Sequence, residues 1–292
     1  MTKNKTWLIV GGDGCIGSHL AVETGRLADH VVTSSRRTAL RTGQVFADLA
    51  TGDTNALVSL APEVVFLCAA VSSITFCRDN PDLSRQTNVT GTVRLAAELV
   101  RRGSFVIFLS SNAVFDGNTE KPDEGSAYCP TTEYGRQKVS AEQQLLTLPG
   151  SKSSVAIIRL SKVLSPDSGM AKEFLARLKA GVPCPALNDL CMSPVSMSYV
   201  TDNLLAIARA KRAGVFHLSG AEEMTYADFA SRLACCLEAD KNLVRSISSG
   251  EAGCAIAFRP AHPALGMKRT LALLGIEPES TEHLMEKLVT GY

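Results

Sequence analysis

A tyrosine and a lysine stand four residues apart in the segment EYGRQK, residues 133–138. On a helix such residues share one face, so Tyr134 and Lys138 are expected to be neighbours. A phenol with a pKa of about 10 is a poor proton donor near neutrality, and a nearby ammonium lowers that pKa. Chance pairs of this kind usually lie on a solvated helix surface, but no other tyrosine of this chain has a lysine at this spacing. The pair is therefore a candidate acid with the cation that tunes it.

Two serines, Ser110 and Ser111, end an apolar run that predicts a buried strand. In an open α/β sheet, ligands bind beyond the carboxyl ends of the strands, which is where these serines fall. A serine hydroxyl at this point can hydrogen-bond a substrate carbonyl oxygen while Tyr134 donates a proton. Together with a hydride from a nicotinamide, this set predicts the reduction of a carbonyl group.

The stretch GGDGCIG, residues 11–17, joins a predicted strand to a predicted helix, which is the context that a dinucleotide-binding loop requires. Glycine permits a tight turn and lets backbone N–H groups approach a pyrophosphate, which then faces the N-terminus of the helix. The alternative is a purely structural turn. We expect this loop to bind the cofactor through Gly11, Gly14, Cys15, Ile16 and Gly17.

The second predicted strand ends in TSSRR and contains no carboxylate. An acidic residue at this place would accept hydrogen bonds from the ribose 2′-OH of NAD(H), whereas arginine can bind a 2′-phosphate through its planar fork. Ser35, Arg36 and Arg37 therefore favour NADP(H) over NAD(H), unless the arginines only form a solvated loop. Asp48 and Leu49, after a further predicted strand, are expected at the adenine edge of the same site.

The elements that must position these residues alternate between short apolar strands and longer helices. Continuous apolar strands bounded by helices indicate a parallel sheet covered on both faces, so we predict a doubly wound α/β fold of the Rossmann type. The predicted strands are residues 7–10, 30–34, 64–70, 104–111, 155–160 and 214–220, and the predicted helices are residues 16–27, 83–102, 134–148, 170–180, 199–209 and 226–237. We place a dinucleotide-binding domain in residues 1–160, to which part of residues 193–219 returns, and a smaller substrate-binding region in residues 161–292.

The composition is that of a folded α/β protein with no strong electrostatic bias. The chain has 292 residues, 45% of them hydrophobic, and a net charge of +1, so neither nucleic acid nor a membrane surface is expected as a partner. The apolar run at residues 7–10 is too short for a signal peptide, and no stretch is long enough to span a membrane. Nine scattered cysteines without C-x-x-C spacing predict reduced thiols in the cytoplasm and no metal site.

Five motifs occur in a recognisable order along the chain: GGDGCIG, LCAA, NVTGT, SSNAVF and YGRQK. With them the sequence resembles the extended short-chain dehydrogenase/reductase family. The resemblance implies that Ser111, Tyr134 and Lys138 form the catalytic triad, and that Lys138 also contacts the nicotinamide ribose. The remaining cofactor residues are expected in LCAA, which ends a strand, and in NVTGT, whose asparagine matches a family asparagine near the active site: Cys68, Ala69, Ala70 and Asn88.

Within this family, the segments SPVSMSYVTDNL, GVFHLSGAEEMTYADFA and RPAHPAL resemble the dTDP-4-dehydrorhamnose reductase branch. That branch implies reduction of a 4-keto-6-deoxy sugar on a nucleoside diphosphate. Two departures bear on which sugar is used: Asn112 stands where the branch often has Asp, and the loop of residues 159–169 lacks the branch's usual aromatic residue. The substrate candidates are Ser72, Asn112 and Arg259, and Arg259 fits a surface salt bridge nearly as well.

The sequence therefore predicts a cytoplasmic reductase that uses NADP(H) to reduce a keto group on a nucleotide-activated deoxysugar. One alternative is a nucleotide-sugar 4-epimerase, which would recycle tightly held NAD. Another is a regulatory subunit that binds a dinucleotide without turnover. The family often dimerises through helices, so a homodimer is an open expectation.

Overall fold

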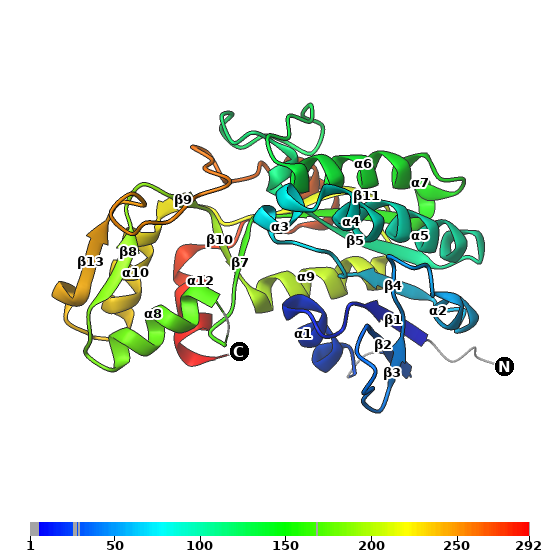
Figure 1. Cartoon of the computed structure of the whole chain (residues 1–292), viewed down its shortest axis with the longest axis horizontal. Helices are drawn as coiled ribbons and strands as arrows, with labels where there is room; N and C mark the ends of the chain where they lie inside the picture. Colours follow the sequence, from blue (N-terminus) through cyan, green and yellow to red (C-terminus); the bar gives the residue numbers. More distant parts are fainter. Residues whose placement is uncertain (1–5, 26–27, 29, 168, 292) are drawn as a thin grey trace. The chain divides into compact units, whose positions relative to one another are not determined.

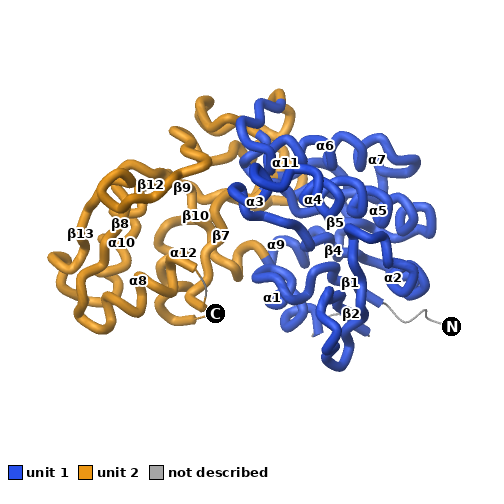
Figure 2. The backbone as a smooth tube through the Cα atoms, viewed as in Figure 1, with its two compact units in different colours: residues 1–114, 128–159, 201–216 blue, residues 115–127, 160–200, 217–292 orange. Residues whose placement is uncertain are grey.

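The computed structural model describes residues 6–25, 28, 30–167 and 169–291, and these residues form two compact units (Figure 2). Unit 1 comprises residues 1–114, 128–159 and 201–216, and unit 2 comprises residues 115–127, 160–200 and 217–292. Three segments of the chain thus build each unit. That the two units act as a dinucleotide-binding and a substrate-binding domain stays a prediction.

A seven-stranded sheet, built mostly from unit 1, has the strand order β11-β6-β5-β4-β1-β2-β3, and most of its labels can be followed in this order in Figure 1. Its strands are β1 (Thr6–Val10), β2 (His30–Ser35), β3 (Gln44–Phe46), β4 (Val64–Leu67), β5 (Phe105–Ser111), β6 (Val155–Leu160) and β11 (Gly214–Leu218). The pairs β1–β2, β1–β4, β2–β3 and β4–β5 are parallel. The strand order reverses between β1 and β4, where ligands bind in open α/β sheets. The predicted doubly wound α/β fold is confirmed.

The helices of unit 1 cover this sheet and bury its apolar strands. They are α1 (Cys15–Thr24), α2 (Asn55–Ser59), α3 (Ile74–Asp79), α4 (Pro81–Arg85), the π-helix η1 (Gln86–Gly91), α5 (Thr92–Arg101), the 3-10 turn η2 (Asn112–Val114), α6 (Glu133–Thr147) and α7 (Ser151–Ser154). Leu95 and Leu99 of α5 share one buried cluster with Val65, Val106 and Ile157 of the strands. Burying these side chains stabilises each by about 1.5–3 kcal/mol relative to exposure, so the core fixes the strand ends that carry the polar residues.

Two predicted elements of unit 1 differ from the observed ones. The strand expected at residues 64–70 ends at Leu67, and the helix expected at residues 83–102 is interrupted by η1. Within η1 the chain widens around buried polar groups: Thr92 Oγ1 donates to the carbonyl of Thr87 at 2.8 Å, five residues back. The periodicity of apolar residues does not reveal such a widening, because a π-helical segment and an α-helix can carry the same apolar pattern over so few residues. The predicted end of the first helix, Leu27, lies outside the described residues.

Unit 2 packs around a cluster of its own, which includes Phe174, Phe229, Leu233 and Leu284. Its elements are β7 (Lys162–Leu164), α8 (Gly169–Lys179), β8 (Cys184–Leu187), β9 (Cys191–Met192), β10 (Pro194–Ser196), β12 (Met224–Thr225), α10 (Tyr226–Cys236), the 3-10 turn η3 (Lys241–Leu243), β13 (Val244–Ile247), α11 (Lys268–Leu274) and α12 (Thr281–Thr290), while α9 (Met197–Ala210) belongs to both units. Short two-stranded sheets replace the long sheet of unit 1.

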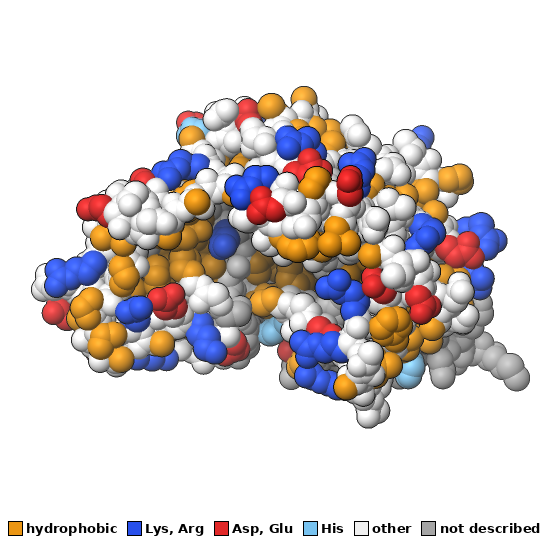
Figure 3. All heavy atoms as spheres, viewed as in Figure 1, with side chains coloured by type: hydrophobic (Ala, Val, Ile, Leu, Met, Phe, Trp, Pro, Cys, Tyr) orange, Lys and Arg blue, Asp and Glu red, His pale blue; other side chains and the backbone are white. Residues whose placement is uncertain are grey.

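The charged side chains form no single-sign patch on the face shown in Figure 3, where lysines and arginines alternate with acidic residues. This distribution agrees with a net charge of +1. Among the described residues, no helix is long and apolar enough to cross a membrane.

Candidate dinucleotide and catalytic site

A pocket of about 530 Å³ opens in unit 1 beyond the carboxyl ends of β1, β2 and β4. Ten of the predicted cofactor residues line it: Gly11, Gly14, Ser35, Arg36, Arg37, Asp48, Leu49, Cys68, Ala69 and Ala70. Cys68, Ala69 and Ala70 reach the pocket because β4 ends at Leu67 and the chain then leaves the sheet. The structure thus brings together residues that are distant in sequence at the switch point of the sheet.

The glycine loop leaves room for a phosphate group. Gly11 has a φ of +90°, and a Cβ there would lie 2.7 Å from the backbone nitrogen of Ala69. A Cβ at Gly14 would meet only the Gly11 carbonyl oxygen within 4 Å, at 3.3 Å, so the space beside Gly14 is much less crowded than that beside Gly11. Gly14 is also the N-cap of α1 and offers no side chain to the first-turn amides. The loop therefore fits the pyrophosphate of a dinucleotide, which such amides bind.

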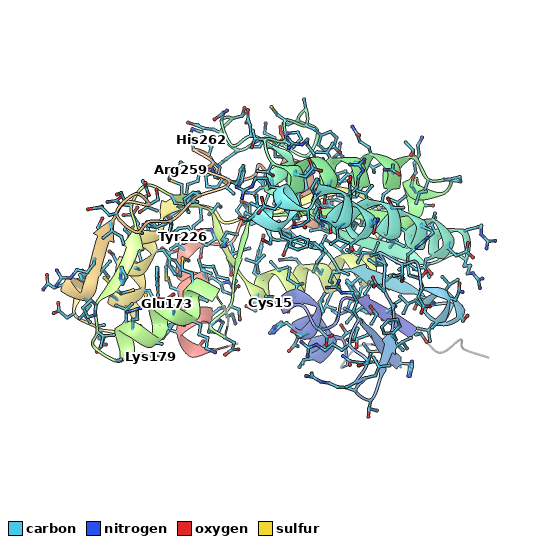
Figure 4. All side chains as sticks on the ribbon, viewed as in Figure 1. Cys15, Glu173, Lys179, Tyr226, Arg259 and His262 are labelled. Atoms are coloured by element: carbon cyan, nitrogen blue, oxygen red, sulfur yellow. The ribbon has the colours of Figure 1, made fainter. Side chains whose placement is uncertain are left out.

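Six predicted cofactor residues do not line this pocket: Cys15, Ile16, Gly17, Asn88, Tyr134 and Lys138. Cys15 begins α1, where Figure 4 labels it, and its side chain is exposed. Gly17 is a buried residue of α1 that packs closely against the glycine loop, where a Cβ would lie 2.2 Å from the Gly11 carbonyl oxygen. Its observed role is close packing of helix against loop, and direct contact of these six residues with a cofactor stays a prediction.

The pocket also contains residues that the sequence analysis missed, above all Asp13 and Ser34. Ser34 Oγ accepts a hydrogen bond from the backbone N–H of Gly11 at 3.0 Å, which ties the glycine loop to β2. Asp13 accepts hydrogen bonds from Ser35 and from Gln44. The second strand itself ends without a carboxylate, as its sequence shows, but the glycine loop brings the carboxylate of Asp13 to its end. Only the pairing of the loop with β2 reveals this.

The three predicted catalytic residues come from two neighbouring elements of unit 1. Ser111 is the last residue of β5, while Tyr134 and Lys138 lie one turn apart at the start of α6. Thr132 caps this helix by accepting the N–H of Gly135 at 3.0 Å, which fixes where its first turn begins. Ser111 lies close enough to Tyr134 to oppose the rise that burial causes in the pKa of its hydroxyl group. The structure thus assembles a serine, a tyrosine and a lysine at the carboxyl end of a central strand.

Lys138 is held beneath Tyr134 by contacts with β5. Its Nζ donates to the carbonyl oxygen of Leu109 at 2.7 Å and lies 4.5 Å from the centre of the Phe108 ring. The distance from Nζ to the centre of the Tyr134 ring is 5.7 Å. The side chain is only 3% exposed, so the ammonium is largely removed from water.

Burial shifts both titrating groups of this set toward their neutral forms. Burial raises the pKa of Tyr134; Cys77 acts in the same direction, and Ser111 opposes it. Burial lowers the pKa of Lys138 to about 8, while Glu142, Cys68 and Cys77 favour the ammonium. The pKa of Tyr134 is therefore raised and not lowered as expected beside Lys138, because desolvation of the phenol dominates.

A buried ion pair lies one helical turn beyond Lys138. Glu142 of α6 has an exposed fraction of 0%, and its Oε2 lies 2.8 Å from Nη2 of Arg159 at the end of β6. The same carboxylate accepts hydrogen bonds from Ser110 and, at 2.9 Å, from the hydroxyl of Tyr128. This network connects β5, β6 and α6 directly behind the catalytic residues. The spacing of Lys138 and Glu142 was visible in the sequence, but the arginine partner was not.

Asn88 serves as a clamp in this structure. Its Oδ1 accepts from the N–H of Val71 at 2.8 Å, and its Nδ2 donates to the Val71 carbonyl at 2.9 Å and to Gln137 Oε1 at 2.8 Å. It is 1% exposed and lies within η1, a π-helical segment of the kind found at functional sites. It therefore ties the loop after β4 to α6.

The predicted substrate residues lie in different surroundings. Ser72 is exposed in the loop before α3, and Asn112 accepts a hydrogen bond from Ser111 Oγ at 3.3 Å. Arg259, which Figure 4 labels in unit 2, pairs with Asp189 at 3.0 Å, so the structure contains the salt bridge that the sequence analysis considered. A role in substrate binding stays a prediction for all three residues.

The comparisons with known proteins concern the whole chain. The model of the family described as "RmlD substrate binding domain" matches residues 5–292. A probable low-salt glycan biosynthesis reductase, Agl14, of Haloferax volcanii is 27% identical over 296 residues, which cover 97% of this chain and 97% of that protein. A dTDP-4-dehydrorhamnose reductase of Mycobacterium tuberculosis is 29% identical over 291 residues, 94% of this chain and 89% of that one.

Among solved structures, a dTDP-4-dehydrorhamnose reductase of Bacillus anthracis in complex with NADP has a TM-score of 0.86. It is 19% identical, and the match covers 100% of both chains. At this identity the likeness concerns the fold, which it confirms from end to end. The resemblance to the extended short-chain dehydrogenase/reductase family that the motifs carry is confirmed as well.

Proposed function

The chain belongs to the RmlD substrate-binding domain family, and on that premise we propose that it reduces a keto group on a nucleotide-activated deoxysugar with a nicotinamide cofactor. One observation carries the proposal: Ser111, Tyr134 and Lys138 converge at the carboxyl end of β5, in the same unit as a pocket suited to a dinucleotide. The names of two matched proteins, both dTDP-4-dehydrorhamnose reductases, support the substrate class.

In the proposed reaction, the bound nicotinamide supplies the hydride to the carbonyl carbon. Ser111 donates a hydrogen bond to the substrate oxygen and holds it beside Tyr134. The Tyr134 hydroxyl then gives its proton to that oxygen as negative charge develops there. Lys138, fixed by the Leu109 carbonyl, places a positive charge below the phenol that stabilises the phenolate left behind.

The same pocket supports a preference for NADP(H) over NAD(H). Arg36 and Arg37 are exposed beside Ser35 at the end of β2, and arginine forks match phosphate geometry. This preference is part of the proposal, as are a cytoplasmic location and a homodimer. The proposed function involves neither nucleic acid nor a membrane as a partner.

The decisive experiment follows NADPH oxidation by the purified protein with a panel of 4-keto-6-deoxy nucleotide sugars. We expect turnover with at least one sugar, and a fall of about 10²–10⁴-fold in kcat for Tyr134→Phe, because the proton donor is lost while the ring is kept. Tyr226→Phe, a half-buried tyrosine of unit 2 in α10, is the matched control and should retain activity.

Three other outcomes separate the alternatives. Tightly bound NAD that copurifies and is recycled would favour a 4-epimerase. NADPH binding without turnover on any sugar would favour the regulatory subunit. A Tyr134→Phe variant as active as the wild-type protein would overturn the assignment of the acid.

A further inference from the structure

The carboxylate of Asp13 lies in the candidate dinucleotide pocket, and the proposed function gives it no task. It projects from the glycine loop between β1 and α1 and lines the pocket beside Ser35 and Arg37. Ser35 Oγ donates to its Oδ2, and Gln44 Nε2 donates to its Oδ1 at 3.3 Å. The Nε of Arg37 lies 3.7 Å from Oδ2. Asp13 thus engages two of the three residues that are expected to hold a 2′-phosphate.

This carboxylate is ionised at neutral pH. The hydrogen bond from Ser35 is the main cause that lowers the pKa of Asp13, and Gln44, Arg37 and Arg41 act in the same direction. The side chain of Asp13 is 24% exposed and that of Arg37 is 68% exposed. The pair is therefore close to water and can open at little cost.

We propose that Asp13 sets the dinucleotide preference of this pocket, as an internal anion that competes with the 2′-phosphate of NADP(H) for Ser35 and Arg37. This inference rests on the proposed function, since it assumes that the pocket binds a nicotinamide dinucleotide.

The physical reason is repulsion between like charges. A 2′-phosphate bound to Ser35 and Arg37 must approach the Asp13 carboxylate or displace it, and either step weakens binding. A ribose 2′-OH meets no such repulsion and can donate a hydrogen bond to a carboxylate. Asp13 therefore lowers the affinity for NADP(H). It makes the preference for NADP(H) over NAD(H) smaller than the arginines alone would give.

The substitution Asp13→Asn isolates this charge, because asparagine has the same shape and keeps an oxygen that accepts a hydrogen bond. We expect NADPH to bind about tenfold more tightly to the variant, and NADH to bind equally or more weakly. The dissociation constants are measured by the fluorescence of the bound reduced nicotinamide, with no sugar present.

Two smaller ligands assign the effect to the 2′-phosphate. Adenosine 2′,5′-bisphosphate and 5′-AMP differ only in that group. Calorimetric titration should therefore show that Asp13→Asn binds the first ligand more tightly than the wild-type protein does, and the second ligand equally well. The gain should shrink as the salt concentration rises, since ions screen exposed charges. Asp79→Asn is the matched control: Asp79 is an exposed carboxylate of α3 that pairs with Arg78 outside the pocket, and its substitution changes the net charge by the same amount.

A second background tests whether Asp13 acts through Arg37. In Arg37→Ala, which should bind NADPH more weakly than the wild-type protein, the further change Asp13→Asn should give a smaller gain. If Asp13→Asn increases the affinity for NADPH as much in this background as in the wild-type protein, Asp13 competes with the 2′-phosphate for Ser35 alone. The proposed competition for Arg37 would then be overturned.

The failure of this inference can be distinguished from the failure of the proposed function. If both dinucleotides bind and Asp13→Asn leaves the ratio of their dissociation constants unchanged, or weakens NADPH, the role of Asp13 is overturned while the reductase remains. If neither dinucleotide binds to the wild-type protein, the pocket has been misassigned and both proposals fall.

Discussion

Asp13 and Glu142 are two carboxylates of unit 1 that each face an arginine, and their surroundings are opposite. The side chain of Asp13 is 24% exposed and its arginine 68%, whereas Glu142 and Arg159 are 0% and 2% exposed. The exposed pair lies 3.7 Å apart at the rim of the dinucleotide pocket, and the buried pair lies 2.8 Å apart behind the catalytic residues.

The difference teaches what each pair is suited for. An exposed ion pair contributes little stability and can exchange partners, which suits a rim that must accept a ligand. A buried pair is no more stabilising than apolar side chains of similar size, but the loss of one partner leaves an uncompensated charge. Glu142 additionally accepts hydrogen bonds from Ser110 and Tyr128, so it holds the strand that ends in Ser111. We therefore assign adaptability to the first pair and rigidity to the second.

The largest expected effect comes from breaking the buried pair. Glu142→Ala should lower the free energy of unfolding by about 3–5 kcal/mol, because Arg159 is left charged and buried. Urea unfolding followed by circular dichroism measures this change. Glu98→Ala is the matched control: Glu98 pairs with Arg101 and Arg102 on the exposed side of α5, and its loss should change stability little.

A double variant then asks whether the missing partner is the cause. Glu142→Leu combined with Arg159→Met should recover much of the lost stability, since it removes both charges and fills the volume. If the double variant is as unstable as Glu142→Ala, the hydrogen bonds to Ser110 and Tyr128, and not the charge of Arg159, carry the cost.

The next effect concerns Lys138, whose ammonium form is favoured by the negative charge of Glu142 one helical turn away. Burial lowers its pKa to about 8, below the value of 10.5 for an exposed lysine. Between these values the unfolded chain holds a proton that the folded protein has released, so the contribution of Lys138 to the free energy of unfolding should rise as the pH rises through this window. Over the same window kcat/KM for NADPH should fall about tenfold per pH unit, because the charged form is lost.

The contribution of Lys138 to stability and its contribution to activity should therefore change in opposite directions with pH. Lys138→Met should flatten the rise in stability, whereas Lys152→Met, at an exposed position in α7, should leave it in place. If Lys138→Met and the wild-type protein show the same pH dependence of stability between pH 8 and 10.5, Lys138 keeps its proton in the folded protein, and the buried carboxylate outweighs desolvation.

The two regions also differ in how far the sequence could predict them. Ser111, Tyr134 and Lys138 were predictable because two lie on one helix face and the third ends an apolar strand. The network around Glu142 needed a partner 17 residues away on another element, which helical spacing cannot supply. Asp13 was not predicted because the carboxylate of a dinucleotide site is expected at the end of β2, whereas this side chain comes from the glycine loop, 22 residues before Ser35. The partners of Glu142 and Asp13 could not be predicted from the sequence, because side chains from separate elements are paired only once the strand order is known.

The smallest expected effect is that of Asp13 on stability, and its dependence on pH sharpens the contrast with Glu142. The pKa of Asp13 is lowered, mainly by the hydrogen bond from Ser35, so its contribution is present above the pKa of the unfolded chain and is lost as the pH falls through the folded value. At neutral pH, Asp13→Asn should therefore be slightly less stable than the wild-type protein, and in acid the two unfolding curves should converge. Because the group is near water, the gap at pH 7 should be far smaller than that of Glu142→Ala. A gap as large as the buried one, measured by the same urea titration, would mean that Asp13 fixes the glycine loop instead of adapting to a ligand, and the division of labour between the two pairs would not hold.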